Sequence, residues 1–235
     1  MQRRSFLSGF LFCSLFAIPA CGQDVRKNGG TKIACVGDSI TYGMGIKDRA
    51  KNAYPKQLEG MLGDGVQVKN FGISGTTLLK NGDHPYWTTK QYHGAIEWQP
   101  EIVVIKLGTN DTKPKNWKHK EQVATDLRAM IAVFRSLPSK PQIFLCLPVP
   151  VFPERWGIRD SVIKDELIPI IRDVAKQEDC AIIDLYQALD GKKEFFPDKV
   201  HPNKDGATVI AKTVAAALKK DAKALVTKTK EKTQP

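Results

Sequence analysis

The sequence of 235 residues has few cysteines and histidines, and none of its apolar runs is long enough for a confident membrane span of about 20 residues. The cysteines are Cys13, Cys21, Cys35, Cys146 and Cys180. Their odd number and wide spacing predict neither a disulfide framework nor a metal site. The histidines are His84, His93, His119 and His201, again without ligand spacing. The sequence therefore predicts no metal and no cofactor.

The formal charge of +11 does not indicate a nucleic-acid partner. Arg3, Arg4 and the lysines from Lys212 onward carry most of this charge, so the body of the chain is only mildly basic. Basic residues are not interleaved with aromatic ones in a cluster, and no nucleic-acid motif occurs. A composition of 42% hydrophobic and 26% charged residues is typical of a globular protein with a sizeable core.

The first 20 residues have the pattern of an export signal, with a positive start followed by a short apolar stretch. Arg3-Arg4-Ser5-Phe6-Leu7 resembles a twin-arginine signal. Ile18-Pro19-Ala20-Cys21 resembles a lipobox, whose cysteine would receive a lipid, and residues 21–30 would form a tether. The alternative is a simple signal cleaved near Ala20 or Gly22. Either way we expect an exported protein, periplasmic or at the cell surface.

Residues 31–220 are expected to form one α/β domain, followed by a basic tail at 221–235. The predicted strands are Thr31–Val36, Val66–Asn70, Glu101–Leu107, Gln142–Leu147 and Cys180–Leu185. Helices are predicted near 52–62 with Asn52 as N-cap, 120–136, 160–176 with a bend at Pro169, and 204–219. This alternation predicts a five-stranded parallel sheet in a three-layer α/β/α sandwich.

In such a sheet, the loops that follow the strands bring side chains to one edge. The loops after the first, second and third strands carry Ser39, Gly75 and Asn110, and the loop after the fifth carries Asp198 and His201. These are the parts that acyl transfer needs: a nucleophile, a base, an orienting carboxylate and oxyanion donors. Each residue taken alone also has an ordinary structural explanation as a turn, cap or surface residue.

Two acidic residues in these loops receive different roles. Asp198 lies three residues before His201, so a turn ending at Pro202 can fold its carboxylate onto the imidazole. Asp38, directly before Ser39, is expected to shape its turn by local hydrogen bonds instead. We therefore predict a Ser39, His201 and Asp198 triad.

Four ordered blocks of the sequence resemble those of the SGNH (GDSL-type) hydrolase superfamily. They are Gly37-Asp38-Ser39-Ile40, Gly72-Ile73-Ser74-Gly75, Gly108-Thr109-Asn110-Asp111 and Asp198-Lys199-Val200-His201. The resemblance implies serine esterase chemistry, with Ser39 as nucleophile, His201 as base and Asp198 as its orienter. It also implies an oxyanion hole of Ser39, Gly75 and Asn110, and a flavodoxin-like strand order of 2-1-3-4-5. Thr109 departs from the glycine of many members.

The stretches Lys106–Trp117 and Cys146–Trp156 look most like bacterial GDSL esterases related to sialate O-acetylesterases and other carbohydrate acetylesterases. Aromatic rings in the loops could stack on sugars, or could instead form a hydrophobic rim or pack in the core. They are Tyr86, Trp87, Trp117 and Trp156. We expect an exported serine esterase acting on O-acetyl groups of carbohydrates, with membrane contact only through a lipidated Cys21.

Three other functions remain open from the sequence. A lysophospholipase or thioesterase would use the same fold and residues on a longer acyl chain. A glycan-binding lipoprotein would use the fold without catalysis, although it would have no need to keep Ser39, Asp198 and His201 together. A flavodoxin-like FMN protein would share the sheet topology alone.

Overall fold

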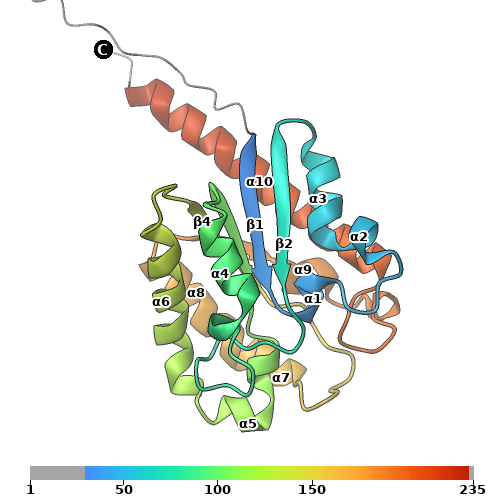
Figure 1. Cartoon of the computed structure of the whole chain (residues 1–235). Helices are drawn as coiled ribbons and strands as arrows, with labels where there is room; N and C mark the ends of the chain where they lie inside the picture. The colour runs from blue at the N-terminus through green and yellow to red at the C-terminus, as the bar shows by residue number, and fades with distance from the viewer. Residues whose placement is uncertain (1–29, 233–235) are drawn as a thin grey trace, which may run out of the picture.

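The computed structural model describes residues 30–232 (Figure 1). The predicted export signal, the Cys21 anchor and nearly all of the tether lie outside the described residues. A parallel sheet has the order β2-β1-β3-β4-β5, which confirms the predicted topology. Its strands are β1 (Thr31–Gly37), β2 (Val66–Gly72), β3 (Ile102–Lys106), β4 (Gln142–Leu147) and β5 (Ala181–Asp184).

The two faces of the sheet pack into separate hydrophobic clusters, because successive side chains of a strand point to opposite faces. Ala34 and Val103 belong to one cluster, while Cys35 and Val104 belong to the other. Since both faces are covered, the central strands are apolar at almost every position. The near-continuous apolar runs in the sequence therefore reflect burial on both sides.

Helices cover both faces, which confirms the three-layer architecture. One face packs against α4 (Lys90–Glu97), α6 (Val123–Arg135) and α8 (Ile168–Gln177), and the other against α3 (Tyr54–Leu62), α9 (Leu185–Leu189) and α10 (Lys204–Lys232). Figure 1 shows α10 passing behind β1 and β2.

Short helices connect these elements. They are α1 (Ser39–Tyr42), α2 (Arg49–Asn52), α5 (Pro114–Trp117) and α7 (Asp160–Val162), with short 3₁₀ turns η1 (Tyr86–Thr88), η2 (Asn110–Thr112), η3 (Lys120–Gln122) and η5 (Lys193–Phe195) and a π-helical turn η4 (Ile163–Leu167). The carboxyl ends of β1 and β2 point toward the end of the molecule where α1, α5 and α7 lie (Figure 1). This end holds the loops that carry the candidate site.

Three expectations about helix boundaries are corrected. Asn52 is the last residue of α2 and does not cap α3, because its side chain donates to the Lys47 carbonyl and Pro55 lies in the first turn of α3. The helix expected at 160–176 is divided by the π-helical turn η4, which ends at Leu167, so that Pro169 lies in the first turn of α8, where its missing N–H does not break a helical hydrogen bond. The last helix continues to Lys232, so most of the expected tail extends α10.

The cysteines of the domain are free thiols. Cys35 and Cys146 are buried, and burial raises the pKa of Cys35 to about 12, which leaves it unreactive near neutral pH. Cys180 is only half-buried. Within residues 30–232, none of the helices combines the length and apolarity that crossing a membrane requires.

Candidate active site

Ser39 is the first residue of α1, directly after β1 ends. Asp38 is the N-cap of this helix, and its carboxylate accepts a hydrogen bond of 2.9 Å from the Ile40 N–H. This confirms its expected role in shaping the turn. Gly37 allows the close approach of strand and helix, since a Cβ atom there would lie 2.1 Å from the Thr41 hydroxyl oxygen. The turn thus delivers the Ser39 hydroxyl to the carboxyl edge of the sheet.

A chain of hydrogen bonds links Ser39, His201 and Asp198. Ser39 Oγ lies 2.8 Å from His201 Nε2, and His201 Nδ1 lies 2.7 Å from Asp198 Oδ2. The other carboxylate oxygen, Asp198 Oδ1, accepts from the backbone N–H of Val200 at 3.0 Å and of His201 at 2.7 Å. The two oxygens therefore have different roles, since Oδ1 stabilises the turn and Oδ2 orients the His201 imidazole.

These contacts also keep Asp198 ionised. Partial burial opposes ionisation, but the hydrogen bonds from the His201 backbone, the His201 ring and the Val200 N–H outweigh it and lower the pKa of the carboxyl. An ionised carboxylate beside Nδ1 favours the tautomer that carries its proton on Nδ1. Nε2 is then a proton acceptor facing the Ser39 hydroxyl.

Gly75 and Asn110 lie on the loops that follow β2 and β3, the two neighbours of β1 in the sheet. Gly75 has a φ of +80°, a left-handed conformation that favours glycine. The Asn110 side chain is buried and donates one amide hydrogen to the Thr76 carbonyl at 3.0 Å, which joins the two loops. An asparagine amide has a second hydrogen that it can donate.

Asp111 fixes the same two loops to each other, a role that the sequence did not reveal. Its buried carboxylate accepts from the Leu78 N–H at 3.0 Å and the Leu79 N–H at 2.7 Å. Burial raises the pKa of Asp111 to about 7, although the N–H groups of Leu79 and Leu78 act in the opposite direction. The Gly75 loop is thus anchored to the residue that follows Asn110.

Lys106 is a second residue that sequence reasoning missed. It ends β3 and is fully buried, and its ammonium group lies 2.9 Å from Asp38 Oδ2 and 2.7 Å from the Thr109 hydroxyl oxygen. A lysine at the end of an otherwise apolar strand could have indicated a buried ion pair, because a lysine is almost never fully buried without a partner. The partner lies 68 positions away in the sequence.

The aromatic residues expected to contact a substrate separate into two groups. Tyr86 is fully buried and donates its hydroxyl to the Phe71 carbonyl, and Trp117 is 6% exposed and donates to Glu166. Core packing, the alternative kept open above, therefore describes both residues, and their expected role in substrate binding is corrected. Trp87 is half-buried and donates its indole N–H to the Leu78 carbonyl at 2.7 Å, so it too packs within the domain.

Trp156 differs from these three because 54% of it is exposed. Its ring centroid lies 5.7 Å from that of His201, with an angle of 43° between the rings. The loop that carries it is held beside the His201 loop by a 2.9 Å hydrogen bond from the Phe152 N–H to the Lys199 carbonyl. Trp156 is thus a partly exposed aromatic ring next to the Ser39, His201 and Asp198 group, with the Arg155 guanidinium 4.7 Å from its centroid.

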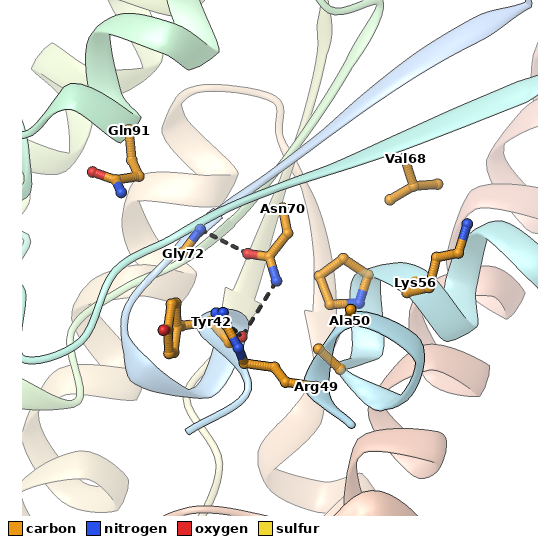
Figure 2. A pocket seen from close by; sticks show the side chains of 10 residues that line it. Tyr42, Arg49, Ala50, Lys56, Val68, Asn70, Gly72 and Gln91 are labelled. Atoms are coloured by element: carbon orange, nitrogen blue, oxygen red, sulfur yellow. Dashed lines mark hydrogen bonds between the residues drawn. The ribbon is translucent and has the colours of Figure 1, made fainter. Parts of the chain in front are cut away.

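A separate hollow of about 330 Å³ lies at the outer edge of β2 and includes none of the predicted site residues (Figure 2). Asn70 crosses it, donating its amide to the Thr41 carbonyl at 2.8 Å and accepting from the Gly72 N–H at 2.8 Å. This side chain ties the end of β2 to α1, which carries Ser39. Arg49 lines the hollow, with its guanidinium 3.6 Å from the centroid of the Tyr42 ring.

No group of three or more His, Cys, Asp or Glu side chains among residues 30–232 is arranged to hold a metal ion.

Comparison with known proteins gives relatives in sequence and in structure. The chain is 44% identical over 224 residues to an acetylxylan esterase from Xylanibacter ruminicola, covering 87% of this chain and 45% of that protein. It is 24% identical to a multidomain esterase from Ruminococcus flavefaciens, covering 82% of this chain and 29% of that protein. The chain therefore spans less than half the length of these two relatives.

Solved structures share the fold at low sequence identity. A carbohydrate acetylesterase from Sinorhizobium meliloti superposes with a TM-score of 0.66 at 19% identity, covering 80% of this chain and 98% of that one. An acetylxylan esterase from Geobacillus stearothermophilus gives a TM-score of 0.61 at 20% identity, covering 80% and 94%. The pattern of the GDSL-like Lipase/Acylhydrolase family matches residues 35–209, a span that includes all four sequence blocks. The chain belongs to the GDSL-like lipase/acylhydrolase family.

Proposed function

We propose that this protein is an exported serine esterase that removes O-acetyl groups from carbohydrates. The observation that carries the proposal is the continuous chain of short contacts from Ser39 Oγ to His201 Nε2 and from His201 Nδ1 to Asp198 Oδ2. A serine hydroxyl becomes a useful nucleophile only when a base can take its proton. This arrangement supplies the base and the carboxylate that holds it in the required tautomer.

In the proposed reaction, Ser39 Oγ attacks the acetyl carbonyl carbon while His201 Nε2 takes the hydroxyl proton. The tetrahedral adduct then collapses, the bond to the sugar oxygen breaks, and His201 returns its proton to that oxygen. Water attacks the acetyl group on Ser39 and gives a proton to His201. Collapse of the second adduct releases acetic acid and restores the Ser39 hydroxyl with the proton from His201.

The developing oxyanion would be stabilised by the backbone N–H groups of Ser39 and Gly75 and by the Asn110 amide. This assignment is supported by the sheet order, which makes the loops after β2, β1 and β3 neighbours. Donors fixed before the reaction starts need no reorganisation when charge develops. Each such donor lowers the barrier by roughly 3 kcal/mol in known cases.

Carbohydrate specificity is supported by Trp156 and by the relative of 44% identity named an acetylxylan esterase. Among the large hydrophobic residues of 30–221, those that are exposed are Met44 and Trp156, and Trp156 is the more exposed of the two. An aromatic face beside the proposed base can pack against the apolar face of a sugar ring. Acetylated xylan fragments are therefore the first substrates to test.

Export is proposed from the leader alone. The twin-arginine and lipobox resemblances at residues 3–7 and 18–21 support secretion, with Cys21 as the lipid attachment point. Fractionation of cells that make the parent chain and Cys21→Ala separates the two versions of this proposal. A parent in the membrane fraction with a soluble variant supports the anchor, whereas identical soluble periplasmic fractions support a simply cleaved signal. Retention of the parent in the cytoplasm contradicts export.

The catalytic proposal is tested with the purified protein on acetylated xylo-oligosaccharides and on 4-nitrophenyl esters from acetate to octanoate. We expect acetate release from the oligosaccharides, the highest kcat/KM at acetate, and loss of nearly all turnover in Ser39→Ala. Ser136→Ala is a matched control, because Ser136 is an exposed serine at the end of α6. Parental rates in Ser39→Ala would show that the nucleophile is wrongly assigned.

The other candidate functions correspond to distinct results. Rates that rise toward octanoate would favour a lysophospholipase or thioesterase. Binding of xylan fragments without turnover, together with no labelling of Ser39 by an organophosphonate, would favour a glycan-binding protein.

A further inference from the structure

Lys106 and Asp38 form an ion pair that is completely buried beneath the proposed nucleophile. Both side chains are 0% exposed, and the ammonium lies 3.1 Å from Asp38 Oδ1 and 2.9 Å from Oδ2. Burying two charges is costly, and a hydrophobic pair of similar volume is often as stable or more stable. Stability alone is therefore a poor explanation for this pair.

The ammonium also reaches the turn that carries Asn110. It donates a 2.7 Å hydrogen bond to the hydroxyl of Thr109, the residue directly before Asn110. On its other side, Asp38 caps α1 through the Ile40 N–H and is directly followed by Ser39. One buried charge thus bridges the two turns that supply the Ser39 N–H and the Asn110 amide.

The charge balance of this bridge also matters for the proposed reaction. Asp38 is a buried carboxylate next to Ser39, and an uncompensated negative charge there would repel the oxyanion that forms on the substrate. The Lys106 ammonium neutralises that carboxylate at 2.9 Å. The Thr109 hydroxyl is the third acceptor for the Lys106 ammonium, after the two Asp38 oxygens. A glycine at position 109 would offer no side-chain oxygen.

We propose that Lys106 is a positioning residue that fixes the Ser39 turn and the Asn110 turn relative to each other, through Asp38 on one side and Thr109 on the other. Lys106 does not touch the substrate and acts through the oxyanion donors. This inference rests on the proposed roles of Ser39 and Asn110 in ester hydrolysis.

The test measures kcat and KM with 4-nitrophenyl acetate, and melting temperature in parallel. Thr109→Val removes the acceptor oxygen while keeping the shape and the Asp38–Lys106 pair, and Thr109→Ser keeps the oxygen. We expect Thr109→Val to lower kcat about tenfold with KM within about threefold, because misplaced donors act mainly on the transition state. Thr109→Ser should restore most of that loss. Equal kcat values for the serine and valine variants would overturn the proposal.

A double-mutant cycle tests whether Lys106 acts through Asn110. Lys106→Met keeps the chain length without the charge, and we expect it to lower kcat by about 10- to 100-fold, because a misplaced oxyanion donor should cost no more than the roughly 100- to 1,000-fold that follows its removal. In the Asn110→Ala background, Thr109→Val, which leaves the Asp38–Lys106 pair in place, should lower kcat by less than about threefold, because coupled positions are not additive. Losses that multiply in the double variant would contradict action through Asn110.

Two controls separate the possible failures. Val104→Ala removes buried side-chain volume from the same strand without touching either turn, and it should lower the melting temperature while kcat stays within about twofold. Ser39→Ala tests the proposed function separately. If this variant hydrolyses the ester, Ser39 is not the nucleophile and the proposed function fails. An inactive Ser39→Ala with equal Thr109→Ser and Thr109→Val leaves the esterase proposal intact and refutes the Lys106 proposal alone.

Discussion

Asp198→Asn offers a sharp test of the proposed triad, because the two oxygens of Asp198 have different partners. Oδ1 accepts from the backbone N–H groups of Val200 and His201, and Oδ2 faces His201 Nδ1 at 2.7 Å. An asparagine can keep its carbonyl oxygen on the two N–H groups, so the turn should stay folded. Its NH₂ group then faces Nδ1, and Nδ1 must become the acceptor.

This exchange reverses the tautomer of His201. With the ring proton on Nε2, the imidazole donates to Ser39 Oγ at the 2.8 Å contact and cannot take its proton. A triad with the wrong tautomer loses a factor of about 10⁴ in kcat, equivalent to about 5.5 kcal/mol in activation free energy. The fold should be almost unaffected, with a change in melting temperature below about 4 °C.

The assay is hydrolysis of 4-nitrophenyl acetate by the parent, Asp198→Asn and Asp205→Asn. Asp205 is an exposed aspartate in the first turn of α10 and serves as a matched control that should keep parental activity. A folded Asp198→Asn protein with kcat within tenfold of the parent would refute the reasoning, because it would show that Asp198 does not set the tautomer of the base.

Burial raises the pKa of Asp111 to about 7, so its contribution to stability should be full below about pH 4 and should fall by about 4 kcal/mol between about pH 4 and pH 7. Asp111→Asn should flatten that dependence in urea unfolding between about pH 4 and 8, and an unchanged slope would contradict the burial argument. Gly75→Ala forces an alanine to a φ of +80°, at a cost of roughly 1–2 kcal/mol in stability, and should lower kcat at least tenfold by shifting the N–H that we propose as an oxyanion donor. A parental kcat in that variant would show that the Gly75 N–H is not an oxyanion donor. Trp156→Ala should raise KM for acetylated xylo-oligosaccharides about tenfold, for a loss of about 1.5 kcal/mol of ring contact. An equal rise in KM for 4-nitrophenyl acetate, which has no sugar, would argue against a sugar-binding role for Trp156.

The order of the elements and the residues of the proposed catalytic group can be predicted from the amino-acid sequence. Apolar runs of strand length, alternating with amphipathic stretches, specify a parallel α/β sheet because each pattern is local and repeats along the chain. Loops that follow parallel strands meet at one edge of the sheet. This rule predicts from the sequence that Ser39, Asn110 and His201 lie close together. The Asp198 spacing of three residues from His201 is local too, and its contact at 2.7 Å follows that expectation.

Which side chains of the loops face the solvent, and which hold the loops together, becomes clear from the folded structure. Tyr86, Trp117 and Trp156 are chemically similar in the sequence, yet two are buried and one is 54% exposed, because burial depends on neighbours far away along the chain. Lys106 likewise has its partner 68 positions away. A residue's periodicity can place it on a strand, but it carries no information about the group that meets it from another loop.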